Sequence, residues 1–204
     1  MPSIADRFHD PAAPRALWIP PGRLVELTGG RNAACATMAV AAVLQGQADG
    51  DTAVWVQPRH GGLFPPDLAE SGVDLDALVV VHVPPGAGSF GIPKTAEILL
   101  RSGAFGLVVL DLRGVRPRGD AWLGRLLGLA REHGSRVVLI TTASAAGDSR
   151  SGPSLGSLVS VRIEPRRVRA SRGLFVIEHE VLKDKLGWFS RLEPDRRRGP
   201  WGLR

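Results

Sequence analysis

The stretch GRLVELTGGRNAACATMAV, residues 22–40, decides the fold, because an apolar strand pattern passes through a glycine turn into a helical pattern. It has the outline of a phosphate-binding loop, G-x-x-x-x-G-K-[ST], in which backbone N–H groups and a Lys hold phosphates and a hydroxyl holds Mg²⁺. Gly29 opens the pattern, but Ala34 replaces the second Gly, Cys35 the Lys and Ala36 the hydroxyl residue. Most of the defining positions have therefore lost the chemistry that a nucleotide site uses.

Outward from this stretch, short apolar runs alternate with amphipathic segments, which is typical of βαβ units on a mainly parallel sheet. The expected strands are residues 23–27, 52–56, 77–82, 107–110 and 136–140, and the expected helices are residues 33–44, 92–101 and 121–132. The Gly- and Pro-rich segments 60–67 and 84–93 are expected to be loops. Two alternating runs, 158–164 and 174–183, predict antiparallel strands. The fold class is α/β: a mainly parallel central sheet flanked by helices, with antiparallel strands appended at one edge.

The chain length of 204 residues is enough for one well-buried domain. We expect an extended Pro-rich arm at 1–21, a core domain at 22–190 and a basic tail at 191–204 that is disordered without a partner. The apolar Leu17, Trp18 and Ile19 of the arm are expected to dock on the domain or on another subunit, with packing on the domain the preferred interpretation. The Gly- and Ser-rich stretch 143–156 predicts a mobile segment with a candidate role in binding.

The net charge of +6 lies in the last part of the chain, because residues 162–204 hold 12 Lys and Arg against 6 Asp and Glu. A basic end of this kind suits nucleic acid, an acidic partner or a merely solvated face, and charge alone does not choose among them. The chain has one Cys, no signal-peptide pattern and no apolar run of about 18 residues. These features predict a cytoplasmic protein without disulfides or a multi-cysteine metal site.

The basic residues near the C-terminus form the candidate surface for nucleic acid or a protein partner. Arg167 and Arg169 should face one side of a strand and Arg166 the other, so the patch is divided. An arginine run close to tryptophans suits stacking on single-stranded nucleic acid or anchoring on a protein, and a disordered tail is the alternative. The candidate residues are Arg166, Arg167, Arg169, Arg172, Lys183, Lys185, Arg196, Arg197, Arg198 and Trp201.

Several strings between about Gly22 and Ser190 resemble the RecA core, in the same order. GRLVELTGG resembles its first strand and loop, and ILLRSGAFGLVVLD at 98–111 resembles the helix and strand that end in its Walker B aspartate. SVRIEPRRV at 160–168 and VLKDK at 181–185 resemble its last strands. A short RecA-like chain with a degenerate loop is similar to the ImuA family, which comprises accessory proteins of bacterial error-prone translesion synthesis.

The resemblance places Asp111 at the Walker B position, which orients Mg²⁺. It places Arg59 at the catalytic Glu position, Thr142 at the sensing Gln position, and Lys183 and Lys185 at a pair that reaches the neighbour's nucleotide in RecA filaments. Phosphoryl transfer depends on positioning and charge stabilisation, so these losses lead us to expect no ATPase activity and no catalytic residue. We also expect no cofactor and no metal, with Asp111 bonded instead to loop backbone. Weak residual phosphate binding by the turn's N–H groups is the alternative.

Cys35 lies near a predicted helix N-terminus, where a thiol can become reactive, but a small apolar filler is the preferred interpretation. The five histidines, His9, His60, His82, His133 and His179, show no metal-ligand spacing.

The resulting hypothesis is a non-catalytic accessory protein of translesion synthesis and the SOS response. Its implied partners are ImuB, which is an inactive homologue of Y-family polymerases, an error-prone C-family polymerase and RecA, with DNA a further candidate through the basic C-terminal region. When active it would be associated with the nucleoid. Two alternatives stay open: a residual ATP-binding RecA paralogue that regulates recombination, and a DNA-binding module that acts alone.

Overall fold

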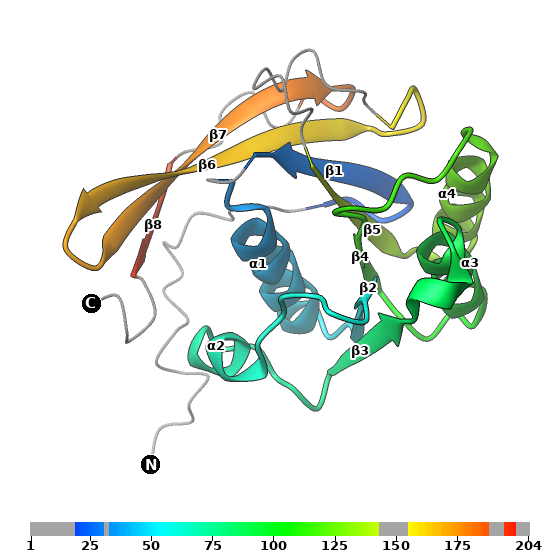
Figure 1. Ribbon diagram of the computed structural model, residues 1–204, viewed down its shortest axis with the longest axis horizontal. Coiled ribbons are helices and arrows are strands. Elements are labelled where there is room, and N and C mark those ends of the chain that lie inside the picture. The colour runs from blue at the N-terminus through cyan, green and yellow to red at the C-terminus, as the bar shows by residue number, and fades with distance from the viewer. Residues whose placement is uncertain (1–18, 31–32, 143–154, 188–193, 199–204) are drawn as a thin grey trace.

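The sheet is built from the buried apolar runs of the sequence. The computed structural model describes residues 19–30, 33–142, 155–187 and 194–198. Within these residues the strands form one eight-stranded sheet in the order β3-β2-β4-β5-β1-β6-β7-β8 (Figure 1). The parallel strands are β1 (Arg23–Gly29), β2 (Ala53–Pro58), β3 (Leu78–Val83), β4 (Leu107–Asp111) and β5 (Arg136–Thr142). β6 (Val161–Ser171) pairs in parallel with β1 and antiparallel with β7 (Leu174–Asp184), which pairs antiparallel with β8 (Asp195–Arg198). The predicted fold class is confirmed.

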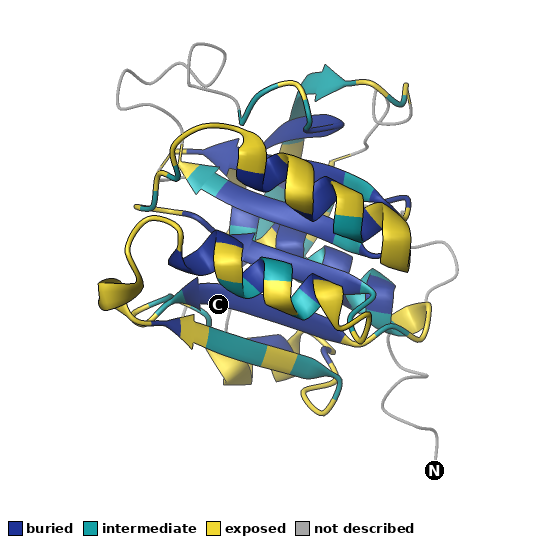
Figure 2. Cartoon of the chain, turned by 90° about the vertical axis from the view of Figure 1, so that its right-hand side faces the viewer, coloured by how far each residue is buried: buried dark blue, intermediate teal, exposed yellow. Residues whose placement is uncertain are grey.

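Helices cover both faces of the parallel part of the sheet. α1 (Cys35–Ala48) packs on one face around Trp55 and Val138, and Leu68 of α2 (Pro65–Glu70) joins the same core. α3 (Gly91–Arg101) and α4 (Ala121–His133) pack on the opposite face. Figure 2 shows these two helices lying across the buried strands, with exposed residues on their outer sides. Two apolar cores, one on each face, therefore hold the sheet between the helices.

β2 and β4 are neighbours in the sheet, but the chain that follows each of them leaves toward the opposite edge. The chain after β2 passes through α2, on the face of α1, to the edge strand β3. The chain after β4 passes through α4, on the other face, to β5. The carboxyl ends of β2 and β4 are therefore the topological switch point of this sheet, where a crevice opens in α/β folds.

Three elements differ from the prediction. Residues 65–70 form α2 although the first half of them lies in an expected loop, because prolines are compatible with the first helical positions. β6 continues through Pro165 and the arginine run to Ser171, well past the predicted end at 164, because β7 pairs with it along that length. Residues 195–198 of the tail that was expected to be disordered form β8 on the edge of β7, so that expectation is wrong for these four residues.

The end of the predicted arm is fixed to the domain. Ile19 is buried in the core on the α1 side, and its carbonyl accepts a hydrogen bond from Arg136 Nε at 2.8 Å. Docking of the arm is thus confirmed for Ile19, whereas Leu17 and Trp18 lie outside the described residues, as does the greater part of the predicted binding segment, 143–154. No helix in the described part of the chain is long and apolar enough to cross a membrane.

Candidate functional site

The turn after β1 is closed by the chain's own contacts. The Ala33 N–H donates to the Gly30 carbonyl at 3.1 Å, and the Ala34 N–H donates to the Pro165 carbonyl of β6 at 2.8 Å. A β-bridge between Ala33 and Arg166 strengthens the same attachment. In a phosphate-binding loop such N–H groups point at the ligand, whereas here the Ala34 N–H is already bonded within the protein.

Gly29 is kept small by this closed turn. A Cβ at Gly29 would lie 2.4 Å from the Cβ of Ala33, which is far inside van der Waals contact, whereas a Cβ at Gly30 would meet nothing within 4 Å. We therefore expect Gly29→Ala to lower the free energy of unfolding by about 1–3 kcal/mol through overpacking. Gly30→Ala is the matched control and should change it little. Urea unfolding of both variants measures the difference, and equal midpoints would contradict the closed turn.

Asp111, the Walker B remnant at the end of β4, holds an arginine. Asp111 is 2% exposed, and its carboxylate accepts from Arg113 in three places: the backbone N–H at 3.1 Å, Nε at 2.8 Å and Nη2 at 2.5 Å. These hydrogen bonds raise the pKa of Arg113 above its usual range. The bond to loop backbone was predicted, but the bidentate arginine was missed. The sequence feature that could have indicated this arginine is a cation two residues after the aspartate that ends a strand.

Cys35 is the first residue of α1 and is buried. Burial raises the pKa of its thiol to about 12, outweighing the opposite effect of the Arg113 charge. The structure therefore agrees with an inert filler, because the reactive thiolate is scarce near neutral pH.

We expect the Cys35 thiol of the native protein to resist Ellman's reagent at pH 8 and to react fully once the chain is unfolded in guanidinium chloride. The unfolded thiol, with a pKa near 9.0, loses its proton before the folded one, so this residue's contribution to stability should fall as pH rises above about 9. Fast labelling at pH 8 without unfolding would show that the thiol is accessible.

The remaining positions implied by the RecA resemblance lie at the same carboxyl edge of the sheet but do not all converge. Thr142, at the sensing position, pairs with Gly29 and therefore sits beside the closed turn. Arg59, at the catalytic Glu position, is exposed after β2, and its N–H donates to the Val83 carbonyl at 3.0 Å. Two strands, β4 and β5, separate β2 from β1. No group of three or more His, Cys, Asp or Glu side chains in the described regions could hold a metal ion.

Lys183 and Lys185 of the C-terminal hairpin region are bound to the segment that leads into β6. Lys183 Nζ donates to the Gly156 carbonyl at 2.9 Å, and Lys185 Nζ donates to the Ser157 carbonyl at 2.5 Å. Burial lowers the pKa of Lys183, and the positive charge of Lys185 acts in the same direction. Both ammonium groups thus hold the C-terminal end of β7 to the segment that precedes β6.

A buried ion pair lies under this segment, between β1 and β6. Glu26 is fully buried, and its Oε2 lies 3.6 Å from Arg162 Nε. Thr141 Oγ1 donates to Glu26 Oε1 at 2.9 Å, and the Leu155 N–H donates to Oε2 at 3.4 Å. This polar cluster was not predicted, because Glu26 interrupts an otherwise apolar strand without any partner at a short sequence spacing.

Three of the predicted basic residues, Arg166, Arg167 and Arg169, lie on β6 of the β6–β7 hairpin, whose course is seen in Figure 1. Arg166 pairs with Glu164 at 3.1 Å and with Glu180 at 3.0 Å, so its charge is balanced locally. Arg167 lies over the Phe175 ring at 5.2 Å, and Phe175 is paired across the hairpin with Arg169. Arg167 and Arg169 therefore share one face, and both are exposed together with Arg172 at the hairpin turn.

β8 carries the arginine run of the tail. Arg196 is exposed and Arg197 Nε pairs with Asp195 at 2.6 Å. Arg198 is the last residue of the strand, and Trp188 and Trp201 lie outside the described residues. Pairing with β7 brings these cations next to the basic hairpin.

These features, a central strand followed by a closed phosphate-loop remnant, a Walker B remnant and an appended hairpin, define a RecA-like α/β protein. The family model for the RecA N-terminal domain matches residues 15–119, and the chain belongs to that family.

The relatives agree with this assignment. The RecA protein of Nocardia farcinica is 37% identical over 104 residues, covering 50% of this chain and 28% of that protein. The RecA protein of Mycolicibacterium vanbaalenii is 28% identical over 178 residues, covering 74% of this chain and 49% of that protein. The chain thus spans less than two thirds of the length of these relatives. The crystal structure of the RadB recombinase shares the fold, with a TM-score of 0.62, 18% identity and 88% of each chain covered.

Proposed function

We propose that this chain is a RecA-like accessory protein that does not turn over ATP and that acts in error-prone translesion synthesis as part of the DNA-damage response. Its partners on this proposal are an ImuB-type inactive polymerase homologue, an error-prone C-family polymerase and RecA. The similarity of a short, loop-degenerate RecA-like chain to the ImuA family supports the assignment.

The observation that carries the proposal is that two groups of the degenerate site, the Ala34 N–H and the Asp111 carboxylate, are bonded within the protein. The Ala34 N–H is bonded to β6, and the bidentate guanidinium of Arg113 covers the carboxylate that would orient Mg²⁺. A loop Lys, a Mg²⁺-binding hydroxyl and a water-polarising carboxylate are missing at Cys35, Ala36 and Arg59. Each electrostatic element of this kind contributes roughly 3 kcal/mol to a transition state, so their joint loss supports an inactive site.

The exposed basic hairpin supports a binding role. Arg167 and Arg169 share one face of the hairpin. The guanidinium of Arg167 is stacked on the Phe175 ring, which fixes it in a position to bind carboxylates or phosphates. On this proposal the hairpin and β8 form the partner-facing surface.

The test is a reconstituted pull-down of the full chain with each polymerase partner and with RecA, with and without DNA. The wild type should retain at least one partner, and Arg167→Glu/Arg169→Glu should release it. The control variant Arg101→Glu/Arg131→Glu makes the same charge change on α3 and α4. It should leave the partner bound. Failure to retain any partner would overturn the proposal. Calorimetry that finds Mg²⁺-dependent ATP binding below millimolar concentration would favour the ATP-binding recombination regulator instead.

A further inference from the structure

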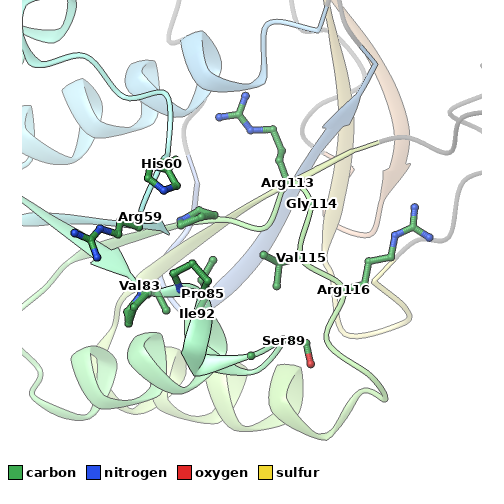
Figure 3. A pocket seen from close by; sticks show the side chains of 13 residues that line it. Arg59, His60, Val83, Pro85, Ser89, Ile92, Arg113, Gly114, Val115 and Arg116 are labelled. Carbon is green, nitrogen blue, oxygen red and sulfur yellow. The ribbon is translucent and has the colours of Figure 1, made fainter.

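A concave pocket lies where the segments that follow β2, β3 and β4 come together, apart from the closed turn after β1. Its volume is about 400 Å³, which is in the range of pockets that hold small organic groups. The floor is apolar, because Val83 and Ile92 are buried and Val115 is half-buried. Figure 3 shows Pro85, Ile92 and Val115 in the middle of the pocket. A hollow with such a floor suits the apolar anchor residue of a protein partner.

Arginines stand on two sides of the rim. Arg59 and Arg116 are exposed, and Figure 3 shows their guanidinium groups pointing outward, away from the pocket and from each other. Neither of them forms an ion pair with another residue in the described part of the chain, whereas Arg113, which also lines the pocket, is bonded to Asp111. None of the described lining residues is acidic. The rim is therefore positive on both sides of an apolar interior.

The outward direction of the two arginines decides which ligand is complementary. Guanidinium groups that point apart do not share one anion inside the pocket, but each can bind a separate carboxylate with bidentate geometry. A polypeptide that inserts one apolar side chain carries its neighbouring residues out over the rim on either side. Charge complementarity then favours a segment in which acidic residues flank the apolar one.

The same features argue against single-stranded nucleic acid as the ligand. Such strands are held by stacking of bases on aromatic side chains and by cations that follow the phosphates. The described lining contains no Phe, Tyr or Trp, and its floor is aliphatic. The guanidinium of Arg113 is engaged by Asp111, so it is not free to hold a phosphate.

Backbone contacts fix the walls of the pocket. The Arg59 N–H is bonded to the Val83 carbonyl, so the ends of β2 and β3 are tied together. The Val115 N–H is bonded to the Leu112 carbonyl in a turn, and Gly114 in that turn has φ +78°, a conformation that favours glycine. A pocket with fixed walls loses little conformational entropy when a partner binds.

We propose that this pocket docks an acidic segment of a partner protein, which inserts one large apolar side chain against Ile92 and Val115 and places carboxylates on Arg59 and Arg116. The site goes beyond the function proposed above, whose partner-facing surface is the hairpin and β8. The two surfaces are separate, because β5 and β1 lie between β4 and β6 in the sheet.

The experiment titrates the full chain into fluorescein-labelled peptides and follows their anisotropy at a salt concentration of about 0.15 M, where exposed charges more than about 8 Å apart are largely screened. The first peptide has a central Trp with two acidic residues on each side. The second has Ala in place of the Trp, and the third has Lys in place of the acidic residues. The first should bind with a dissociation constant below about 1 mM, and the other two at least about tenfold more weakly.

Variants of the chain place the binding in the pocket. Val115→Phe should fill part of the pocket and weaken binding of the Trp peptide at least about tenfold. Arg59→Glu/Arg116→Glu should weaken it by a similar factor through repulsion of the carboxylates. Arg101→Glu/Arg131→Glu is the matched control, because it makes the same charge change on α3 and α4, and it should change the dissociation constant by less than about twofold. Thermal melts show that the variants fold, and the peptide comparison decides the matter if Val115→Phe does not.

Several results would overturn the proposal. They are absence of binding by the Trp peptide, equal binding of the Trp and Ala peptides, and equal weakening by the rim and control variants. Labelled dT20 that binds the wild type and is released by Val115→Phe would assign the pocket to nucleic acid instead. Light scattering that finds a dimer in the wild type and a monomer in Val115→Phe would assign it to a second copy of this chain. The pull-down with the hairpin variant is scored separately, so failure of this site and failure of the proposed function remain distinguishable.

Discussion

Replacing Glu26 with Leu is expected to lower the free energy of unfolding by about 3–5 kcal/mol, because it removes the carboxylate of a buried ion pair. Glu26 is fully buried and the Arg162 side chain is only 7% exposed, so water cannot replace the lost partner. The substitution also removes the acceptor of the Thr141 hydroxyl. Urea unfolding followed by tryptophan fluorescence measures the effect.

The double variant Glu26→Leu/Arg162→Leu separates the cost of removing one partner from the contribution of the pair. Buried ion pairs replaced by apolar side chains often lose little stability, so the double variant should be more stable than Glu26→Leu alone. A double variant at least as unstable as the sum of both single variants would show that the pair itself stabilises the fold.

Replacing Trp55 with Ala is expected to cost about 3–5 kcal/mol, the range for truncation of a large aromatic side chain in a packed core. Trp55 is 1% exposed and lies on β2 in the core beneath α1. A cavity at this position would weaken the packing of the central strands against α1. The measurement is again the urea midpoint at an unchanged slope, followed by circular dichroism because a tryptophan is lost.

Trp55→Phe is the control for that truncation. The indole Nε1 of Trp55 has no hydrogen-bond partner in the described regions, so Phe removes an unsatisfied donor while keeping most of the ring. It should therefore cost much less than Ala. A Phe variant as unstable as the Ala variant would mean that the indole N–H is satisfied in solution.

The strands of the parallel sheet could be predicted because burial on both faces imposes uninterrupted apolar runs, such as residues 107–110. β8 could not, since Asp195 to Arg198 has no apolar periodicity and becomes a strand only through pairing with β7. The end of β6 was missed for the same reason. Its arginines after Pro165 pair with β7, and that is a tertiary effect rather than a local preference.

The candidate site was predictable in its positions but not in its contacts. Motif spacing located Asp111 and the turn at Gly29 on the carboxyl edge of the sheet, where the structure has them. It gave no sign that Arg113 would turn back onto Asp111, because that depends on side-chain torsions and on the shape of the following turn. The pocket of about 400 Å³ in Figure 3 is lined by residues 58–60, 83–92 and 113–116, which follow β2, β3 and β4, so no single stretch of sequence contains it.

The place of β1 in the sheet has a consequence for the order of folding. Its neighbours are β5 and β6, so Arg23 pairs with Arg136 and Val25 with Val161, each more than a hundred residues later in the chain. During synthesis at about 5–20 residues per second, β1 therefore waits on the order of ten seconds for its first partner. The first strand made thus stays unpaired until β5 at residues 136–142 has been made, and its apolar residues need protection until then.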